Sequence, residues 1–297
     1  MAKPAIGFIG LGLMGSAMVD RLQSLGYPMT VMANRARANV EAAVARGATE
    51  VPTAKALAEA AEIVMLCVDT SASVEARMRG AEGVIAGLKP GSLVIDFGTS
   101  LPGSTKALGA EVRAAGSAYM DAPLGRTPAH AVEGKLNIMA AGEAADFARA
   151  EPVFEDLGEN VFHLGPLGAG HTLKLINNFF AMTTATAMAE AFAIADRAEI
   201  PRQQLYEVMS AGPLKSGMMD FIRAQAVDRE VMLAFSIGNA RKDVGYYAAM
   251  ADDLGVPSQI APATKHALGM AAANGWGEKM VPEMVDYLAA LFGPKGG

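Results

Sequence analysis

The pattern of apolar and polar positions changes character after Gly170. Before it, short apolar runs rich in Val, Ile, Leu and Met alternate with longer amphipathic stretches. This alternation predicts buried strands joined by helices, and therefore a doubly wound α/β sheet of the Rossmann type. The expected strands are 5–9, 29–34, 62–68, 93–98, 119–124, 136–142 and 160–165, and helices are expected at 36–47, 53–60 and 71–87.

The remainder of the chain carries only helical patterns. One pattern runs from His171 to Ala198 without Pro or Gly, and its apolar surface is wide enough to pack on both domains and on a second subunit. Further helices are expected at 201–211, 214–227, 239–254, 258–273 and 279–292. The sequence therefore predicts a Rossmann-type dinucleotide-binding domain at 1–165, followed by an all-α C-terminal domain at 166–297 for substrate binding and oligomerisation.

A glycine pattern follows the first expected strand and opens a helix. Gly10, Gly12 and Gly15 form G-x-G-x-x-G, which in this context is typical of a dinucleotide site. The first glycine allows a tight turn, the second lets a pyrophosphate approach the backbone, and the third lets helix and strand pack closely. A strand–helix turn without a ligand is the alternative. The residues expected to bind the cofactor here are Gly10, Leu11, Gly12, Leu13, Met14 and Gly15.

The end of the second strand bears on which cofactor is used. An Asp or Glu there would bind the free 2′-hydroxyl of NAD. The chain instead has Ala33, Asn34 and Arg35, followed by Arg37. A neutral strand end followed by guanidinium suits a 2′-phosphate, so we expect NADP or NAD, with NADP favoured. Alternatively, the arginines are solvated residues at a helix start.

Ligands of such sheets bind at the carboxyl ends of the strands. Val68, Asp69 and Thr99 lie at these ends and are expected to contact the cofactor. The segment 124–127 reaches the same edge, and its Gly125, Arg126 and Thr127 combine a flexible turn, a fixed cation and a hydroxyl. That combination predicts a clamp for a small anion, although an Arg126 that points to solvent is the alternative.

The composition excludes several classes of protein. The chain has 297 residues, 52% of them hydrophobic, which suffices for two domains, and its net charge of −6 argues against nucleic acid as a partner. A single cysteine excludes disulfides, and the four His residues have no paired spacing, so we expect no metal. With no signal peptide and no membrane-spanning run, a cytoplasmic protein is expected.

Two polar pairs are candidates for chemistry. Lys174 and Asn178 are four residues apart and share one face of the long helix, among apolar neighbours. Burial lowers the pKa of a lysine, which suits an acid–base group, although a lysine that extends toward solvent at a helix start is the alternative. Lys242 and Asp243 open another helix, where Lys242 can reach an anion and Asp243 can hold Lys242 or the helix N-terminus. A solvated charge pair is the alternative.

These residues together make the chain resemble the β-hydroxyacid dehydrogenase family, which includes 3-hydroxyisobutyrate dehydrogenase. The resemblance spans the whole chain and rests on 7-GFIGLGLMG-15, 96-DFGTS-100, 121-DAPLGRTPAHAVEGKL-136, 168-GAGHTLKLINN-178 and 242-KD-243. It implies that Lys174 is the proton donor or acceptor, that Asn178 and Lys242 hold the substrate, and that the protein is a homodimer or homotetramer.

The sequence departs from the family pattern at two places. Gly98 stands where the family usually has Ser, and 124-LGRT-127 stands where it usually has V-S-G-G. The Gly-Arg-Thr loop resembles the subgroup that reduces 3-sulfolactaldehyde, whose sulfonate offers three acceptor oxygens to a guanidinium and a hydroxyl.

The resulting hypothesis is an NAD(P)-dependent reductase of a small anionic semialdehyde, with Lys174 protonating the substrate oxygen, and most specifically a 3-sulfolactaldehyde reductase. Dehydrogenases of the 3-hydroxyisobutyrate, 4-hydroxybutyrate or tartronate semialdehyde type are the alternatives within the class. An imine reductase and a non-catalytic nucleotide-binding scaffold are further alternatives, and the presence of Lys174 argues against both.

Overall fold

The computed structural model describes residues 3–33 and 37–293. It divides the chain into two compact units, Met1–Lys174 and Leu175–Gly297. The sequence predicted a boundary between 165 and 166, whereas this division lies inside the long helix α9, Ala169–Arg197. The helix that begins in the first unit thus continues into the second.

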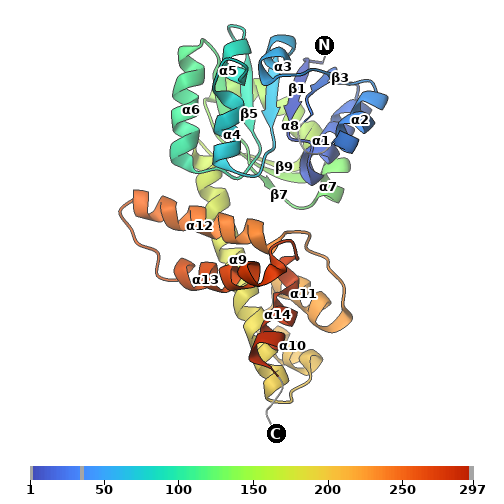
Figure 1. Ribbon diagram of the computed structural model, residues 1–297, viewed down its shortest axis with the longest axis vertical. Coiled ribbons are helices and arrows are strands. Elements are labelled where there is room, and N and C mark those ends of the chain that lie inside the picture. The colour runs from blue at the N-terminus through green and yellow to red at the C-terminus, as the bar shows by residue number, and fades with distance from the viewer. Residues whose placement is uncertain (1–2, 34–36, 294–297) are drawn as a thin grey trace. The chain divides into compact units, whose positions relative to one another are not determined.

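The first unit is built on a parallel sheet of six strands in the order β3-β2-β1-β4-β5-β6. Every residue of β1, β4 and β5 is buried, because helices cover both faces of the sheet (Figure 1). The fold class predicted from the alternating pattern is confirmed. The strands are β1 Ile6–Ile9, β2 Met29–Val31, β3 Thr49–Glu50, β4 Ile63–Leu66, β5 Leu93–Asp96 and β6 Ala118–Asp121, and the helices are α1 Leu13–Ser24, α2 Arg37–Ala45, α3 Ala54–Ala60, α4 Ser71–Met78, α5 Val84–Gly87 and α6 Pro102–Ala114.

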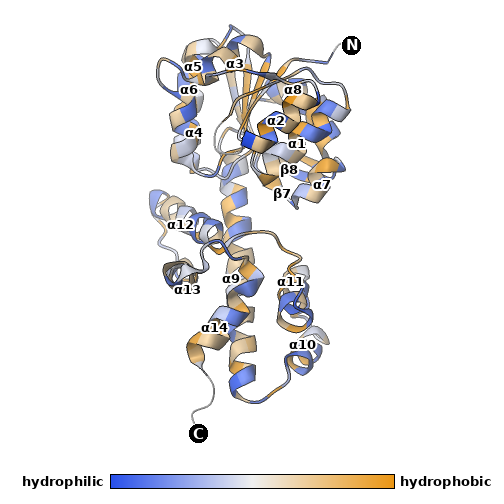
Figure 2. Cartoon of the chain, turned by 45° about the vertical axis from the view of Figure 1, so that its right-hand side comes forward, coloured by the Kyte–Doolittle hydropathy of each residue, from blue (hydrophilic) through white to orange (hydrophobic). Residues whose placement is uncertain are grey.

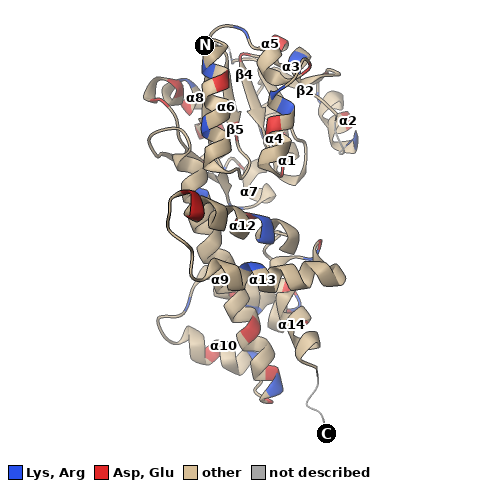
Figure 3. Cartoon of the chain, turned by 60° about the vertical axis from the view of Figure 1, so that its left-hand side comes forward, with Lys and Arg blue, Asp and Glu red and all other residues tan. Residues whose placement is uncertain are grey.

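Alternate strand residues supply two separate cores, one on each face of the sheet. Met65 and Ile95 belong to one buried cluster, and their neighbours Val64 and Val94 belong to the other. Figure 2 shows the sheet strands coloured as hydrophobic, and Figure 3 shows the Lys, Arg, Asp and Glu residues mainly on the helices. Because alternate strand residues are buried in the two cores, polar functional groups are left to the ends of the strands.

A second, small sheet was not predicted. Its order is β7-β8-β9, with β7 antiparallel and β9 parallel to the central β8. The run expected as one strand at 119–124 is divided at Pro123, which has no N–H to donate: β6 ends at Asp121, and β7 begins at Leu124. The further elements are β7 Leu124–Gly125, α7 Pro128–Val132, β8 Leu136–Ala140, α8 Ala144–Leu157 and β9 Gly158–His163.

The second unit consists of helices around the continuation of α9. Buried Met182, Phe192, Ile237 and Leu268 contribute to its core. The helices after α9 are α10 Arg202–Ser210, α11 Gly217–Arg223, α12 Ile237–Asp253, α13 Ala261–Ala271 and α14 Met284–Phe292, with π-helical turns at Ala224–Asp228 and Ala272–Trp276 and a 3-10 turn at Val281–Glu283. Within the described residues, no helix combines the length and apolar character needed to span a membrane.

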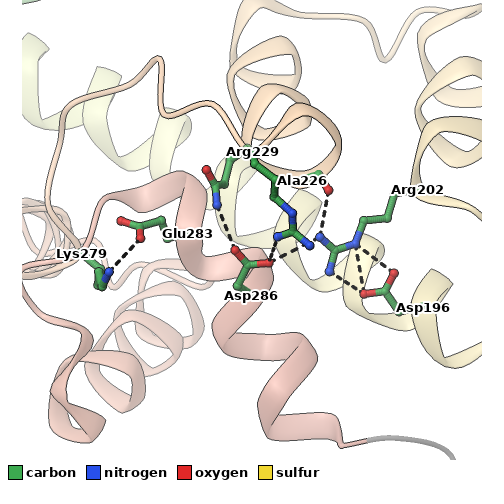
Figure 4. A network of polar contacts seen from close by, with 8 residues as sticks. Asp196, Arg202, Ala226, Arg229, Lys279, Glu283 and Asp286 are labelled. Carbon is green, nitrogen blue, oxygen red and sulfur yellow. Dashed lines mark hydrogen bonds and ion pairs between the residues drawn. The ribbon is translucent and has the colours of Figure 1, made fainter.

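A network of charged side chains links three parts of this unit (Figure 4). Arg202 on α10 pairs with Asp196 on α9 at 2.7 Å and with Asp286 on α14 at 3.5 Å, and Arg229 pairs with Asp286 at 2.6 Å. Burial acts to raise the pKa of Asp286, but hydrogen bonds from Gln225 and Arg229 and the two guanidinium charges bring it below its usual value. The network thus favours the ionised form of Asp286.

Candidate functional site

The glycine turn has the geometry that a dinucleotide site requires. Gly10 has a φ of +100°, and a Cβ there would lie 2.2 Å from the carbonyl oxygen of Cys67. A Cβ on Gly15 would lie 1.9 Å from the Gly10 oxygen, whereas a Cβ on Gly12 would meet nothing within 4 Å. The first and third glycines are therefore required by packing, and the second leaves open space before α1. The residues of this turn fit a bound pyrophosphate.

Neighbouring elements hold this turn in place. The side chain of Asn39 on α2 donates to the Leu11 carbonyl at 2.7 Å, and Leu11 is buried. Met14 packs against the core beneath the sheet, while Leu13 is 71% exposed. The backbone of the turn is thus fixed, while at Leu13 the start of α1 remains open to solvent.

Of the residues predicted to bind a 2′-phosphate, Asn34 and Arg35 lie outside the described residues. Arg37, the other arginine of this segment, pairs with Glu41 at 3.0 Å and with Glu50 on β3. Carboxylates of this unit thus hold the Arg37 guanidinium, a relationship that the sequence did not predict.

The carboxyl ends of β4 and β5 approach each other closely, because the two strands are parallel neighbours. The Gly98 N–H donates to Asp96 at 2.8 Å, and a Cβ on Gly98 would lie 2.9 Å from the Val68 oxygen. Asp69 accepts a hydrogen bond from Ser73 at 2.9 Å, and Thr99 is half-buried. Val68, Asp69 and Thr99 therefore lie just beyond the ends of adjacent strands.

The helical unit brings Asn178 and Lys242 to one buried carboxylate. The Asn178 amide donates to Asp243 at 2.6 Å, and the Lys242 ammonium pairs with Asp243 at 3.0 Å. Asp243 is 2% exposed, and next to it Phe179 stacks on Tyr247 with centroids 4.1 Å apart. The pairing of Asn178 with Asp243 was not predicted, because the two residues are 65 positions apart.

Lys174 lies half-buried early in α9. The sequence suggested an apolar setting formed by its neighbours, but Leu173 and Ile176 are 41% and 45% exposed. Only Leu175 among the adjacent apolar residues is fully buried. Lys174 and Asn178 share one face of the helix by their spacing, as expected for a four-residue separation.

The segment 124–127 has partners within the first unit. Arg126 adopts a φ of +75°, donates to the Lys135 carbonyl at 2.8 Å and forms an ion pair with Glu159 at the start of β9. The Thr127 hydroxyl is hydrogen-bonded to the His130 ring at 2.7 Å. The sequence identified the cation and the hydroxyl of this loop but not the residues that hold them.

A buried cluster of ionisable residues lies under the same strand ends and was not predicted. Asp96 ends β5, Asp121 ends β6, and His171 lies in the first turn of α9, all with 0% exposure. Among the described residues, no group of three or more His, Cys, Asp or Glu side chains is arranged to hold a metal ion.

Both parts of the chain match known protein families. Residues 5–165 match the NAD binding domain of 6-phosphogluconate dehydrogenase, and residues 168–288 match the family described as NAD-binding of NADP-dependent 3-hydroxyisobutyrate dehydrogenase. The chain is 33% identical over 276 residues to 3-sulfolactaldehyde reductase of Escherichia coli, covering 93% of this chain and 92% of that protein.

Two further relatives differ in substrate. NAD-dependent L-serine dehydrogenase of Pseudomonas aeruginosa is 34% identical over 204 residues, which cover 69% of this chain and 68% of that protein. The structure of Mycobacterium tuberculosis 3-hydroxyisobutyrate dehydrogenase with L-serine superposes with a TM-score of 0.87 at 23% identity, covering 97% and 99% of the two chains. The latter likeness shows the fold.

Proposed function

Because this chain belongs to the β-hydroxyacid dehydrogenase family, the group of NAD(P)-dependent oxidoreductases that includes 3-hydroxyisobutyrate dehydrogenase, we propose that it interconverts a small anionic semialdehyde and its hydroxyacid. We propose 3-sulfolactaldehyde as the substrate. The observation that carries this choice is Arg126 between Gly125 and Thr127, in the loop where the family usually has Ser-Gly-Gly.

The chemistry divides between cofactor and protein. When bound at the glycine turn, the nicotinamide cofactor supplies or accepts the hydride. Lys174 donates a proton to the substrate oxygen during reduction and removes it during oxidation. Asn178, one helical turn further, orients the same oxygen, and Asp243 fixes the direction of its amide through the 2.6 Å hydrogen bond.

The substrate anion is bound by the loop at 124–127. To bind the anion, Arg126 breaks its ion pair with the half-exposed Glu159 and contacts the sulfonate oxygens instead. A guanidinium and a hydroxyl on one short loop match the tetrahedral oxygens of a sulfonate better than a single ammonium does.

The ion pair of Arg126 with Glu159 also favours a second candidate. If Arg126 serves only to hold β7 to β9, the substrate anion is a carboxylate bound elsewhere. Substrates of the 3-hydroxyisobutyrate, 4-hydroxybutyrate or tartronate semialdehyde type then fit the same catalytic residues. The two candidates make opposite predictions for Arg126 variants.

Substitution of Arg126 separates the two candidates. Arg126→Ala is expected to lower kcat/KM for 3-sulfolactaldehyde by roughly 10- to 200-fold, because a charge-assisted contact contributes about 1.5–3 kcal/mol. Arg126→Lys is expected to recover only part of this loss, since an ammonium lacks the planar fork. The measurement is steady-state kinetics with 3-sulfolactaldehyde and an uncharged aldehyde of similar size.

The partner of Arg126 provides the matched control. Glu159→Gln removes the carboxylate that competes for Arg126, so kcat/KM for the sulfonate is expected to stay equal or to rise. If the Arg126–Glu159 pair is structural, both Arg126→Ala and Glu159→Gln should instead lower kcat/KM. Equal losses on charged and uncharged aldehydes in Arg126→Ala would contradict the sulfonate clamp.

We further propose that NADP is preferred over NAD, since no acidic residue follows β2. Ala33→Asp is expected to shift the kcat/KM ratio toward NAD, because the new carboxylate binds a 2′-hydroxyl and repels a 2′-phosphate. The ratio of kcat/KM for the two cofactors is the measurement. A wild-type enzyme that prefers NAD would contradict this proposal.

The chain is also proposed to form homodimers or homotetramers. Phe180 and Ile194 on α9 are 72% and 54% exposed in the single chain, so their apolar surface is available to a second subunit. Sedimentation equilibrium tests this, and a monomer at micromolar concentration would contradict it.

A further inference from the structure

The small sheet brings three residues into one row beside the loop at 124–127. Gly125 on β7 pairs with Asn137 on β8, and Asn137 pairs with Asn160 on β9. Paired residues of neighbouring strands point to the same face of a sheet. Ile138, the next residue along β8, is buried in the core, so the two asparagine side chains lie on the opposite face, where Gly125 contributes no side chain.

The amide of Asn137 is oriented by its partner on β9. The Asn160 Nδ2 donates to the Asn137 Oδ1 at 2.8 Å. The Nδ2 of the half-buried Asn137 lies near β7, because a Cβ added to Gly125 would lie 3.6 Å from this nitrogen. A side-chain amide nitrogen carries two N–H donors. Within the part of the chain that the structure describes, neither donor of Asn137 is used, so both remain for a ligand.

The cation of the loop lies at the same part of the small sheet. Arg126 donates to the Lys135 carbonyl at 2.8 Å, and Lys135 is two residues before Asn137. Arg126 also pairs with Glu159 of β9, the residue before Asn160. Neighbouring strands lie about 4.8 Å apart and successive residues about 3.3 Å apart, so donors in these adjacent rows can reach one small anion.

The glycine of this loop makes room for the amide. Gly125 stands where the family usually has Ser. A side chain at this position would bring its Cβ to 3.2 Å from the Asn137 Cβ, which is tighter than an ordinary contact. With glycine, the polar group on this side of the loop comes from β8. Each of the three oxygens of a sulfonate can accept more than one hydrogen bond, so an amide adds to a guanidinium and a hydroxyl without competing with them.

We propose that Asn137 is a further substrate-binding residue, whose Nδ2 donates to the anionic group of the substrate while Asn160 orients the amide. This inference rests on the semialdehyde function proposed above. Asn137 transfers no proton in the reaction, so its loss should weaken binding of anionic substrates and raise KM more than it lowers kcat.

Three variants of the full-length enzyme separate binding from a structural link between β8 and β9. Asn137→Asp is nearly isosteric and still accepts from Asn160, but it has no N–H donor and its charge repels the substrate anion. Asn137→Leu removes the donor and the bond to Asn160 without adding a charge. Asn160→Leu removes only the partner that orients the amide.

Steady-state kinetics with 3-sulfolactaldehyde and with an uncharged aldehyde of similar size provide the first measurement. Asn137→Leu is expected to lower kcat/KM for the sulfonate roughly 10- to 100-fold, and Asn137→Asp should lower it further. Asn160→Leu should cause a smaller loss, and all three variants should retain kcat/KM for the uncharged aldehyde within about threefold. Wild-type kinetics of Asn137→Asp, or equal losses on the two aldehydes, would overturn the proposal.

A binding measurement keeps this inference distinct from the choice of substrate. The side-chain ¹⁵N amide signal of Asn137, identified by its loss in Asn137→Asp, should shift when 2-hydroxyethanesulfonate is added to the enzyme with bound cofactor. The same titration with 3-hydroxypropionate tests a carboxylate. A shift with the carboxylate alone would refute the sulfonate substrate and leave the role of Asn137 standing, whereas no shift with either anion would overturn that role.

Discussion

Two buried carboxylates hold α9, Asp121 at the start of the helix in the first unit and Asp243 at Asn178 in the second unit, and they bind different kinds of group. Asp121 accepts hydrogen bonds from two backbone N–H groups, those of Gly168 and His171. Asp243 accepts from a side chain, the amide of Asn178, and pairs with Lys242. Replacing Asp121 should therefore disturb the start of α9, whereas replacing Asp243 should change the orientation of the Asn178 and Lys242 side chains.

The same contrast applies to the basic residues beside these carboxylates. In the first unit, the basic residue is His171, which is fully buried and lies with its Nδ1 2.7 Å from the Thr105 hydroxyl. In the second unit, it is Lys242, whose side chain is 19% exposed and has four rotatable bonds. A rigid buried group suits a structural role, and a longer, partly exposed one suits contact with a substrate.

The largest effect is expected at Lys174, which lies between the residues held by these two carboxylates. Lys174→Ala should lower kcat by about 10²- to 10⁴-fold, the usual range for loss of a general acid–base group, with cofactor binding retained. Stopped-flow kinetics and cofactor titration measure both. Lys215→Ala, at an exposed position of the helical unit, is the control and should retain full activity. Near-normal turnover of Lys174→Ala would remove the acid–base assignment.

The next effect is expected at Asp121, on stability. Asp121→Ala leaves the buried N–H groups of Gly168 and His171 without an acceptor, which should lower the free energy of unfolding by roughly 2–5 kcal/mol. Asp121→Asn keeps one acceptor oxygen and is expected to lose less. Urea unfolding of the three proteins gives the values. If both variants are as stable as the wild type, the helix start does not depend on this carboxylate.

The contrast between the units also indicates what a sequence can and cannot predict. Short apolar runs predicted five of the six strands of the main sheet, all except the exposed β3, because a buried strand needs apolar residues on both faces. Strand β7 has only two residues and no detectable period, and α8 contains Pro152 in its interior, which argues against a helix in sequence alone. Similarly, α6 includes Gly109, where an added Cβ would lie 2.2 Å from the end of the Leu167 side chain.

The candidate site divides in the same way. Local motifs indicate Gly10, Lys174 and Arg126, because each belongs to a short pattern with a known physical purpose. The carboxylates that pair with the candidate residues are far away in sequence: Glu159 is 33 positions from Arg126, and Asp243 is 65 positions from Asn178. Asp121 and His171, 50 positions apart, meet only because a strand end and a helix start are adjacent in the fold. No local pattern predicts such pairs.

The smallest effect is expected at Asp243, and it distinguishes the two carboxylates most sharply. Asp243→Asn keeps an oxygen near the Asn178 amide but removes the charge that pairs with Lys242, so kcat/KM should fall about 10-fold, equivalent to roughly 1.4 kcal/mol. Because Asp243 holds side chains rather than a helix end, the Tm should change less than in Asp121→Ala. In combination with Asn178→Ala, the losses in kcat/KM should be less than additive, since both changes break one hydrogen bond. Fully additive losses, or a Tm loss as large as that of Asp121→Ala, would mean that Asp243 stabilises the helical unit and does not orient the substrate-binding groups.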